Sequence, residues 1–353
     1  MTRTPTYATR EDVKNALDFK QTARADRQID RALHTASRGV DALCRRRFYP
    51  EIATRSWDWP NAQRARPWRL WLDENELLSV TEVTTGGDIV PPESVFLEPN
   101  AYGPPYNQVQ LDTASASSGW IGGDTHQRSI TITGLYAGCR DDETTAGMTT
   151  SALNDTATTV SVDAAASAQV GVGSLLRLDT ERVIVTGRRQ ADTGQTLTAD
   201  IDAQAKTVLL SVADGAQFAI EETILIDGER CLIVDIAGNS LIVRRAWDGS
   251  TLAAHTTGTA VYAPRALSVT RGALGTTAAA HSSTATVHLF TPPALVHQLA
   301  LAEAINVLLQ EQAGWFRTAT GGSTSREATL TALTALRTQV YDALGRKARL
   351  RGV

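Results

Sequence analysis

Cysteine, lysine and aromatic residues are scarce in this 353-residue sequence, and no apolar run is long enough to span a membrane. The three cysteines, Cys44, Cys139 and Cys231, are odd in number and lack metal-ligand spacing, which is typical of buried thiols in a reducing compartment. The first residues contain no apolar stretch, so the sequence predicts no signal peptide. The formal net charge of −4 argues against a general nucleic-acid binder.

The motifs of common catalytic sites are also missing. The sequence contains no GxxxxGKS/T, HExxH, GxSxG or CxxC motif, and no GxGxxG after an expected strand. His255 and His281 occupy equivalent repeat positions without metal partners at the usual spacing, so we interpret them as turn or packing residues. The carboxylate pairs Asp179/Glu181 and Asp227/Glu229 could indicate catalysis or a calcium site, but both pairs lie at expected hairpin turns, where aspartate is favoured for local hydrogen bonding. The sequence therefore predicts no catalytic, cofactor-binding or metal-binding residue, and a protein that is not an enzyme.

Helical periodicity occurs near both ends of the chain. Residues 9–48 place Ile29, Leu33 and Val40 on one apolar stripe. Residues 292–313 are apolar on nearly every side, which predicts a buried helix, and a last helix is expected at about 324–345. Between positions 54 and 138 the period changes to two, with Gly and Pro clusters between the segments, which indicates a short-stranded antiparallel sheet.

An internal repeat occupies the middle of the chain. Residues 241–262 and 267–288 share nine identities at an offset of 26, whereas 159–185 resembles 207–233 at an offset of 48. A tandem duplication would give one offset. Two offsets follow if one module, module B, is inserted into a loop of the other, module A, provided that the ends of the inserted module lie close together. The alternative is two tandem modules, the first with a degenerate second half.

These patterns predict the α+β class. We expect a mostly helical host domain with a small antiparallel sheet, interrupted by a large all-β insertion of two nested, small β-barrel-like modules. The host comprises residues 1–148 and 290–353, with its sheet at 54–138. The insertion comprises residues 149–289, with module A at 158–190 plus 265–289 and module B at 205–264.

The order of elements in this host resembles the head-to-tail connector or adaptor proteins of tailed bacteriophages. The resemblance rests on "TREDVKNAL", on a long helix ending "LCRRRFYP", on the strands "TRSWDW" and "RLWLDENELLSVTEVT", and on two late helices. It covers residues 7–140 and 290–353. The repeated segments also look like short β modules of phage structural proteins. Adaptors of this type are often much shorter, so the role of residues 149–289 does not follow from the resemblance.

The resemblance implies a structural virion protein at the neck, the head-tail interface, which is in the host cytoplasm during assembly. Such subunits form a homo-oligomeric ring, commonly a dodecamer, that contacts the portal protein and a tail or stopper protein. Genomic DNA passes through the lumen without sequence-specific binding, and no membrane is involved. A cyclic ring needs two different complementary faces on each subunit.

Two basic clusters are candidate contacts in such an assembly. The C-terminal segment is expected to dock in an acidic groove of the portal through Arg346, Lys347, Arg349 and Arg351. The arginine run near the end of the early helix is expected to pair with carboxylates of a neighbouring subunit through Arg45, Arg46 and Arg47.

Two other functions remain open from the sequence. The aromatic-rich sheet and the β modules could belong to a tail-associated protein that binds a carbohydrate or a receptor. An unrecognised hydrolase is the third hypothesis. Only Trp247 and Tyr262 of the repeat region are large aromatic rings with polar handles, so the repeats lack an aromatic pattern suited to sugar stacking, which favours the ring adaptor.

Overall fold

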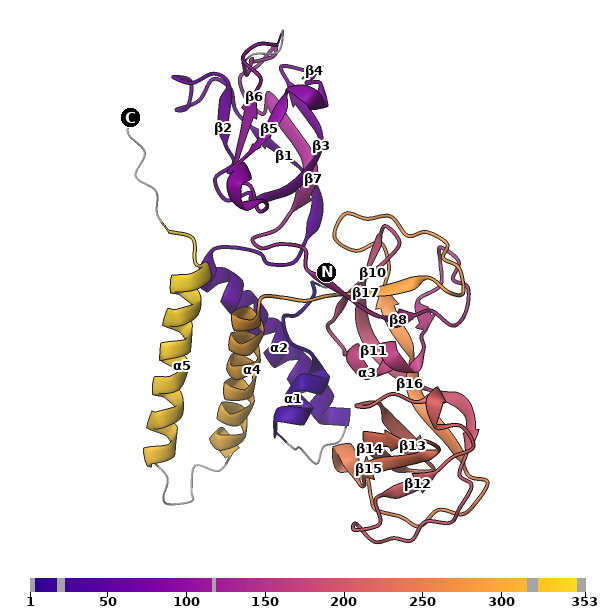
Figure 1. The fold of residues 1–353 in the computed structure, drawn as a ribbon. Helices are drawn as coiled ribbons and strands as arrows, with labels where there is room; N and C mark the ends of the chain where they lie inside the picture. Colours follow the sequence, from indigo (N-terminus) through magenta and orange to yellow (C-terminus); the bar gives the residue numbers. More distant parts are fainter. Residues whose placement is uncertain (1–3, 18–22, 116–118, 316–322, 348–353) are drawn as a thin grey trace. The chain divides into compact units, whose positions relative to one another are not determined.

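The computed structural model describes residues 4–17, 23–115, 119–315 and 323–347 (Figure 1). The chain forms two compact units, one of Met1–Gly39 and Glu143–Thr334, and the other of Val40–Asp142 and Ala335–Val353. Strands hold 35% of the residues and helices 25%. The expectation of a mostly helical host domain is therefore wrong, and the fold is mostly β.

Residues 51–136 show why the helical content was overestimated. They form β1 (Glu51–Trp57), β2 (Arg69–Trp71), β3 (Leu77–Thr85), β4 (Asp88–Ile89), β5 (Val95–Glu98), β6 (Gln108–Leu111) and β7 (Ile130–Tyr136). One sheet has the order β1-β7-β3-β4 and the other β2-β6-β5. Their apolar side chains share one core that includes Trp59, Trp120 and Tyr136. Because these strands bury their apolar faces against each other, they form a β body and do not line a helical one.

Three helices of the first unit pack around a separate small core. They are α1 (Arg10–Leu17), α4 (Ala294–Trp315) and the part of α2 (Ala23–Cys44) that belongs to this unit. The last helix, α5 (Ser323–Leu344), is divided between the two units. Val13, Ile29, Leu33 and Leu308 belong to the shared core of α1, α2 and α4. Thr9 caps α1, because its hydroxyl accepts from the Asp12 N–H at 3.1 Å while Asp12 accepts from the Thr9 N–H at 2.7 Å.

Helix α4 is less buried than its composition predicts. Leu301, Ile305 and Val307 are only half-buried, and Leu309 is 44% exposed. Within the described part of the chain, the apolar surface of this helix is therefore incompletely covered.

Residues 143–290 form a ten-stranded sheet in which β9 (Thr159–Ser161) pairs with β16 and the others follow the order β12-β15-β14-β13-β16-β11-β10-β17-β8. The outer elements are β8 (Glu143–Met148), α3 (Ala164–Gln169), β10 (Leu175–Leu178), β11 (Glu181–Thr196), β16 (Ala260–Thr270) and β17 (Thr286–Phe290). Between β11 and β16 in the sequence lie β12 (Leu209–Ser211), β13 (Thr223–Ile226), β14 (Glu229–Ala237) and β15 (Ser240–Arg244).

Two hydrophobic cores lie along this sheet. One contains residues from 146–185 and 267–287, and the other contains residues from 197–263. The long strands β11 and β16 pair from Ile184↔Thr270 to Thr196↔Ala260 and so run past both cores. The second core thus comes from a segment that separates the two halves of the first in the sequence.

The hairpin turns of the two modules share one backbone geometry. Asp179 has a φ of 49° and Asp227 a φ of 50°, whereas the residues that follow, Thr180 and Gly228, have no positive φ. A type I′ turn, which an Asp-Gly pair favours, requires a positive φ at both positions, so neither hairpin has a type I′ turn and the second position does not need glycine. This geometry explains why threonine can replace glycine in module A.

Helix α1 is bonded to both modules within the first unit. The Val172 N–H donates to Glu11 Oε2 at 2.7 Å in module A. Lys14 Nζ lies 3.0 Å from Asp248 Oδ2, in the short 3₁₀ helix η4 (Trp247–Gly249) of module B. The modules are therefore tied to the N-terminal helix by charged contacts.

Candidate functional site

The predicted contact residues follow two helix ends in the second unit. Arg45, Arg46 and Arg47 come directly after α2, and Arg346 and Lys347 follow α5. The other two predicted residues of the C-terminal segment, Arg349 and Arg351, lie outside the described residues.

The arginine run terminates α2. Arg45 has a φ of 51°, the left-handed conformation that glycine usually supplies after a helix. The Arg46 N–H then donates to the Asp41 carbonyl at 3.2 Å, which is the long bond of a Schellman motif. This sharp ending directs the chain toward β1 and presents successive arginines in different directions.

Glu76 joins the two predicted basic clusters. Its Oε1 lies 3.2 Å from Arg46 Nε and 3.3 Å from Arg346 Nε, and its Oε2 accepts from Arg346 Nη2 at 2.5 Å. The Arg346 N–H also donates to the Cys44 carbonyl at 3.0 Å. Because the Glu76 side chain is only 9% exposed, these bonds lie in a partly desolvated place and hold the C-terminal segment to the end of α2.

Arg47 has a different role from its neighbours. Its side chain is 62% exposed and lies 3.4 Å from Glu51, which is a weak surface contact. Its carbonyl accepts from the Gly138 N–H at 2.6 Å. The structure therefore groups Arg45 and Arg46, but not Arg47, with the C-terminal cations.

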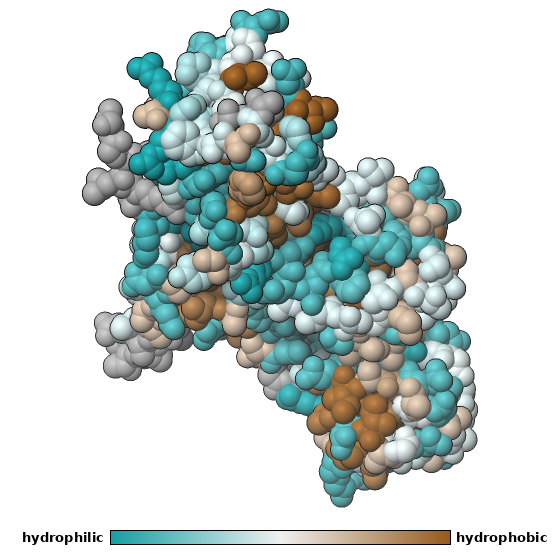
Figure 2. Space-filling view, turned by 45° about the horizontal axis from the view of Figure 1, so that its top comes forward, coloured by the Kyte–Doolittle hydropathy of each residue, from teal (hydrophilic) through white to brown (hydrophobic). Residues whose placement is uncertain are grey.

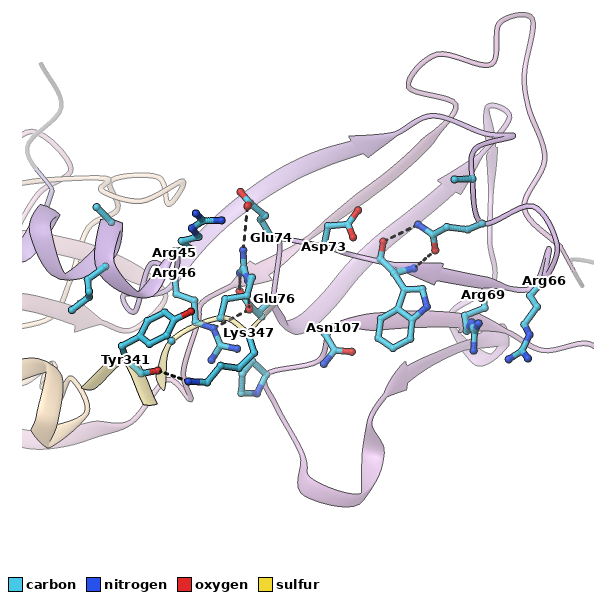
Figure 3. Close-up of a pocket in the computed structure, with 18 of the residues that line it drawn as sticks. Arg45, Arg46, Arg66, Arg69, Asp73, Glu74, Glu76, Asn107, Tyr341 and Lys347 are labelled. Carbon is cyan, nitrogen blue, oxygen red and sulfur yellow. Dashed lines mark hydrogen bonds and ion pairs between the residues drawn. The ribbon is translucent and has the colours of Figure 1, made fainter. Parts of the chain in front are cut away.

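A pocket of about 1430 Å³ lies at this junction (Figure 3). Its charged lining has six basic side chains: Arg45, Arg46, Arg66, Arg69, Arg346 and Lys347. Three acidic side chains also line it: Asp73, Glu74 and Glu76. Since Glu76 is already bonded to two arginines, the charge facing the pocket is predominantly positive.

Aromatic rings back two of these cations. The Arg69 guanidinium lies 5.6 Å from the Trp71 ring centroid, and Lys347 Nζ lies 4.3 Å from that of Tyr341. Gln63 fixes the strand at Trp71, because its Oε1 accepts from the Trp71 N–H at 2.7 Å. Figure 3 shows Arg66 and Arg69 near one end of the pocket and Lys347 and Tyr341 near the other. This arrangement suits a carboxylate-rich ligand better than an apolar one.

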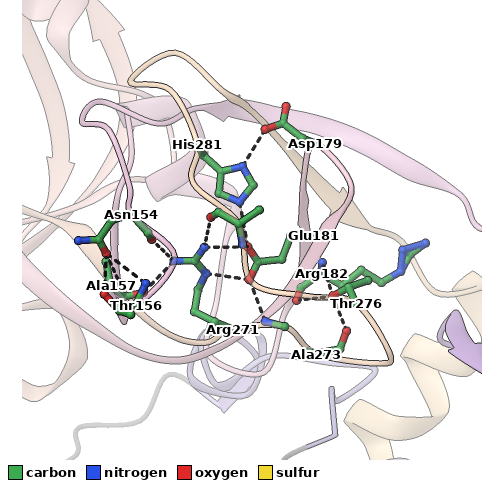
Figure 4. Close-up of polar contacts among 12 residues, drawn as sticks. Asn154, Thr156, Ala157, Asp179, Glu181, Arg182, Arg271, Ala273, Thr276 and His281 are labelled. Carbon is green, nitrogen blue, oxygen red and sulfur yellow. Dashed lines mark hydrogen bonds and ion pairs between the residues drawn. The ribbon is translucent and has the colours of Figure 1, made fainter.

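A second polar constellation lies inside module A (Figure 4). Arg271 forms a two-bond pair with Glu181, with Nε and Nη2 each donating at 2.7 Å. His281 Nε2 lies 2.9 Å from Glu181 Oε2, and His281 Nδ1 lies 2.7 Å from Asp179 Oδ2. Glu181 also accepts from the backbone N–H of Gly272 and Ala279. We call this group clasp A.

Module B contains the same group, which we call clasp B. Arg245 donates two bonds of 2.7 Å to Glu229. His255 Nε2 lies 2.9 Å from Glu229, and its Nδ1 lies 2.8 Å from Asp227. Clasp A thus joins residues 179–181 to 271–281, and clasp B joins residues 227–229 to 245–255. The two parts of clasp A therefore come from before and after the segment that contains clasp B, and this order of the repeat halves gives two different sequence offsets.

The donors in each clasp determine the ionisation of its glutamate. Burial alone would raise the pKa of Glu181, but bonds from Arg271, His281 and two backbone N–H groups outweigh it and lower that pKa to about 2. Burial would also raise the pKa of Glu229, but the bonds from Arg245 and its neighbours outweigh burial and lower that pKa to about 2. Both carboxylates are therefore firmly ionised at neutral pH.

The clasps are closed to a substrate. Glu181 and Glu229 have 0% relative exposure, His281 5% and His255 3%. Their polar atoms are occupied by one another and by the backbone of the connection that precedes each histidine. We conclude that these residues fix that connection against the hairpin, as a structural element of each module.

Sequence reasoning found the histidines but missed the arginine–glutamate pairs. Glu181 with Glu229 and Arg271 with Arg245 are identical residues at equivalent repeat positions. That identity was the available signal. When both copies of a repeat keep the same acidic and the same basic residue beside apolar strand residues, the two side chains are predicted to form a buried ion pair.

The described residues contain neither a candidate membrane span nor a candidate metal site. None of their helices is long and apolar enough to cross a membrane. They contain no group of three or more His, Cys, Asp or Glu side chains suited to hold a metal ion.

Comparisons with protein-family models, with curated proteins and with solved structures returned no match to this chain.

Proposed function

We propose that this chain is a subunit of the ring that joins portal and tail in a tailed bacteriophage, and that its basic pocket receives an acidic segment of a neighbouring protein. The observation that carries the proposal is the pocket itself. Two basic clusters that are about 300 residues apart in the sequence converge on it, and Glu76 holds them together.

Within this site the arginines have two roles. Arg46 and Arg346 pair with Glu76 and stabilise the pocket wall. Arg45 and Arg66 line the same pocket and are exposed, so they are placed to contact a carboxylate-rich partner. Long-range attraction to such a partner depends on net pocket charge and weakens with salt.

Incomplete burial of α4 supports the oligomeric part of the proposal. A helix that is apolar on nearly every side is normally covered on every side. Leu301 and Ile305 pack against the helical core but stay only half-buried, and Leu309 is 44% exposed, so the uncovered part of these side chains offers a surface for a neighbouring subunit. Ring closure requires such a surface on one side of the subunit to meet a different surface on the next.

Charge reversal tests the pocket. Arg45→Glu combined with Arg66→Glu should reduce binding to the portal ring of the same virion by at least ~10-fold in a pull-down or by electron microscopy of mixed particles. Arg64→Glu is the matched control, because Arg64 is an exposed arginine of the same loop that does not line the pocket. Equal binding by the double variant and the control would refute the pocket as the contact.

Truncation separates the C-terminal segment from the pocket. A chain ending at Lys347 keeps the bonds of Arg346 to Glu76, whereas a chain ending at Gly345 loses them. If residues 348–353 dock in the portal, the first truncation should abolish attachment while the fold is unchanged. Unchanged attachment would assign binding to the pocket alone.

Electron microscopy of the unmodified chain should show closed rings of cyclic symmetry, and a chain that stays monomeric with and without the portal would refute the ring.

A further inference from the structure

Three residues that follow α5 form part of the wall of the basic pocket (Figure 3). They are Gly345, Arg346 and Lys347, which we call the strap. The Gly345 N–H donates to the Tyr341 carbonyl at 2.8 Å, and the Arg346 N–H donates to the Cys44 carbonyl at 3.0 Å. The second bond joins the strap to the end of α2, so the pocket is complete only while the strap is docked there.

One carboxylate holds two guanidinium groups in this docked arrangement. Arg46 Nε and Arg346 Nε lie 3.2 and 3.3 Å from the same oxygen, Glu76 Oε1. Two positive charges and one negative charge leave one positive charge uncompensated. The side chains of Arg46 and Arg346 are 25% and 17% exposed, so water screens this charge poorly. Docking of the strap therefore creates an excess of positive charge around Glu76.

Neighbouring groups leave this excess largely in place. Arg45 lines the same pocket and adds a positive charge. Glu74 Oε1 lies 3.8 Å from Arg346 Nη1, but the Glu74 side chain is 76% exposed, so it compensates little. Figure 3 shows Asp73 farther along the pocket. Arg346 Nη1 is also buried without a hydrogen bond among the described residues, and an unsatisfied charged donor opposes docking.

We propose that a carboxylate-rich ligand in the pocket holds the strap in its docked position, on the premise that this pocket is the proposed site of the acidic partner segment. Carboxylates of the ligand compensate the positive charge that docking creates. Because the ligand binds the docked form better than the undocked one, binding and docking strengthen each other by the same factor. The strap is thus a ligand-controlled wall of the pocket.

This coupling orders the contacts of the proposed assembly. Arg349 and Arg351 follow the strap directly in the sequence. A partner segment that fills the pocket first fixes the residues from which this basic stretch begins. The basic stretch then makes its own contact at a lower cost in conformational entropy.

Amide exchange at Arg346 reports docking of the strap, because this N–H bonds to the Cys44 carbonyl only in the docked form. The probe is a hexaglutamate peptide with blocked ends, and hexaglutamine is its neutral control. Neither peptide has an apolar side chain for the hydrophobic residues that Figure 2 shows gathered on module B, in the other unit. With hexaglutamate at about 100 times its Kd, exchange at Arg346 should slow by ~10-fold to ~100-fold, and the upper value holds if only the docked form binds. Hexaglutamine should leave it unchanged.

The outcomes separate the strap from the pocket. Calorimetry of the unmodified chain should give a hexaglutamate Kd that rises with salt. If hexaglutamate binds in this way but exchange at Arg346 stays the same, the coupling is overturned while the pocket remains the proposed partner site. If hexaglutamate does not bind at all, both the coupling and the pocket are overturned.

Glu76→Gln and Glu74→Gln separate the role of Glu76 from the general charge of the pocket. Each variant removes one carboxylate from the lining, but only Glu76 is bonded to both arginines. Without a ligand, Glu76→Gln should accelerate exchange at Arg346 by at least ~10-fold, and hexaglutamate should slow it again. Glu74→Gln should accelerate it by less than ~3-fold. Equal effects of the two variants would overturn the proposal, and the test on the unmodified chain does not depend on how either variant folds.

Discussion

Replacing Glu229 by glutamine should open module B locally. The change keeps the shape of the side chain but removes its charge, which leaves Arg245 unpaired in a place where it is 1% exposed. Truncating one partner of a buried ion pair costs about 3–5 kcal/mol. The lowering of the Glu229 pKa from 4.5 to about 2 gives a similar value, roughly 3 kcal/mol at about 1.4 kcal/mol per pKa unit.

Hydrogen–deuterium exchange detects this opening without assuming that the whole chain unfolds in one step. A loss of about 3 kcal/mol should accelerate exchange of the protected amides around clasp B by about 100-fold. Among them is the Ala253 N–H, which donates to Glu229 Oε2 at 3.1 Å. Amides of the unit that contains β1–β7 should exchange as before.

Asp227→Asn is the matched control. Asp227 bonds to the same histidine, but its side chain is 64% exposed, so its loss should cost less than ~1 kcal/mol. If Glu229→Gln changed local exchange no more than Asp227→Asn, the conclusion that the clasp stabilises the module would be refuted.

Three further predictions concern pH and two glycines. The pKa values of both clasp glutamates are lowered in the folded chain, so the stability that each ionised glutamate contributes is complete above about pH 4.5 and is lost as the pH falls toward about pH 2. In urea titrations the free energy of unfolding should fall by about 2 kcal/mol for each glutamate between pH 6 and pH 3. The Glu229→Gln variant should show a smaller fall. Gly134→Ala should destabilise the β1–β7 unit by about 2 kcal/mol, because a Cβ there would lie 2.2 Å from the Ser79 carbonyl oxygen. A tryptophan-fluorescence unfolding curve measures this loss, and an unchanged midpoint would contradict the close approach. Gly228→Thr should change module stability by less than ~0.5 kcal/mol, because the position has no positive φ and module A has Thr180 there; a large loss would contradict the turn geometry.

Local patterns in the sequence predicted the elements well. The apolar stripe containing Ile29 and Leu33 belongs to α2, and the two late helices occur at Ala294–Trp315 and Ser323–Leu344. Period-two alternation at Ile130–Tyr136 matches a strand with alternating burial. Periodicity reports which face of an element is apolar. It does not report which other element covers that face, and this is why residues 51–136 were assigned to a helical host when they form their own core.

The candidate pocket was predictable only in part. Arg46 and Arg346 were selected from two basic runs, but no sequence rule connects either of them to Glu76. That bond depends on the sharp ending of α2 at Arg45, a left-handed residue that propensities would assign to glycine. Arg66 lies in the loop before β2 and Arg69 begins that strand, and the path of both is set by tertiary contacts, so their approach to the same pocket had no signal in the sequence.

Interruption of one core by another constrains how the chain can fold as the ribosome makes it. All residues of the 197–263 core have been synthesised before the first of residues 267–287 emerges, so this inner core can close while the outer one is still incomplete. Within residues 143–185, β10 can already pair with β11, but β8 and β9 must wait for their partners β17 and β16. Early closure of the inner body brings β11 and the start of β16 together, and the waiting strands then meet a template already in register.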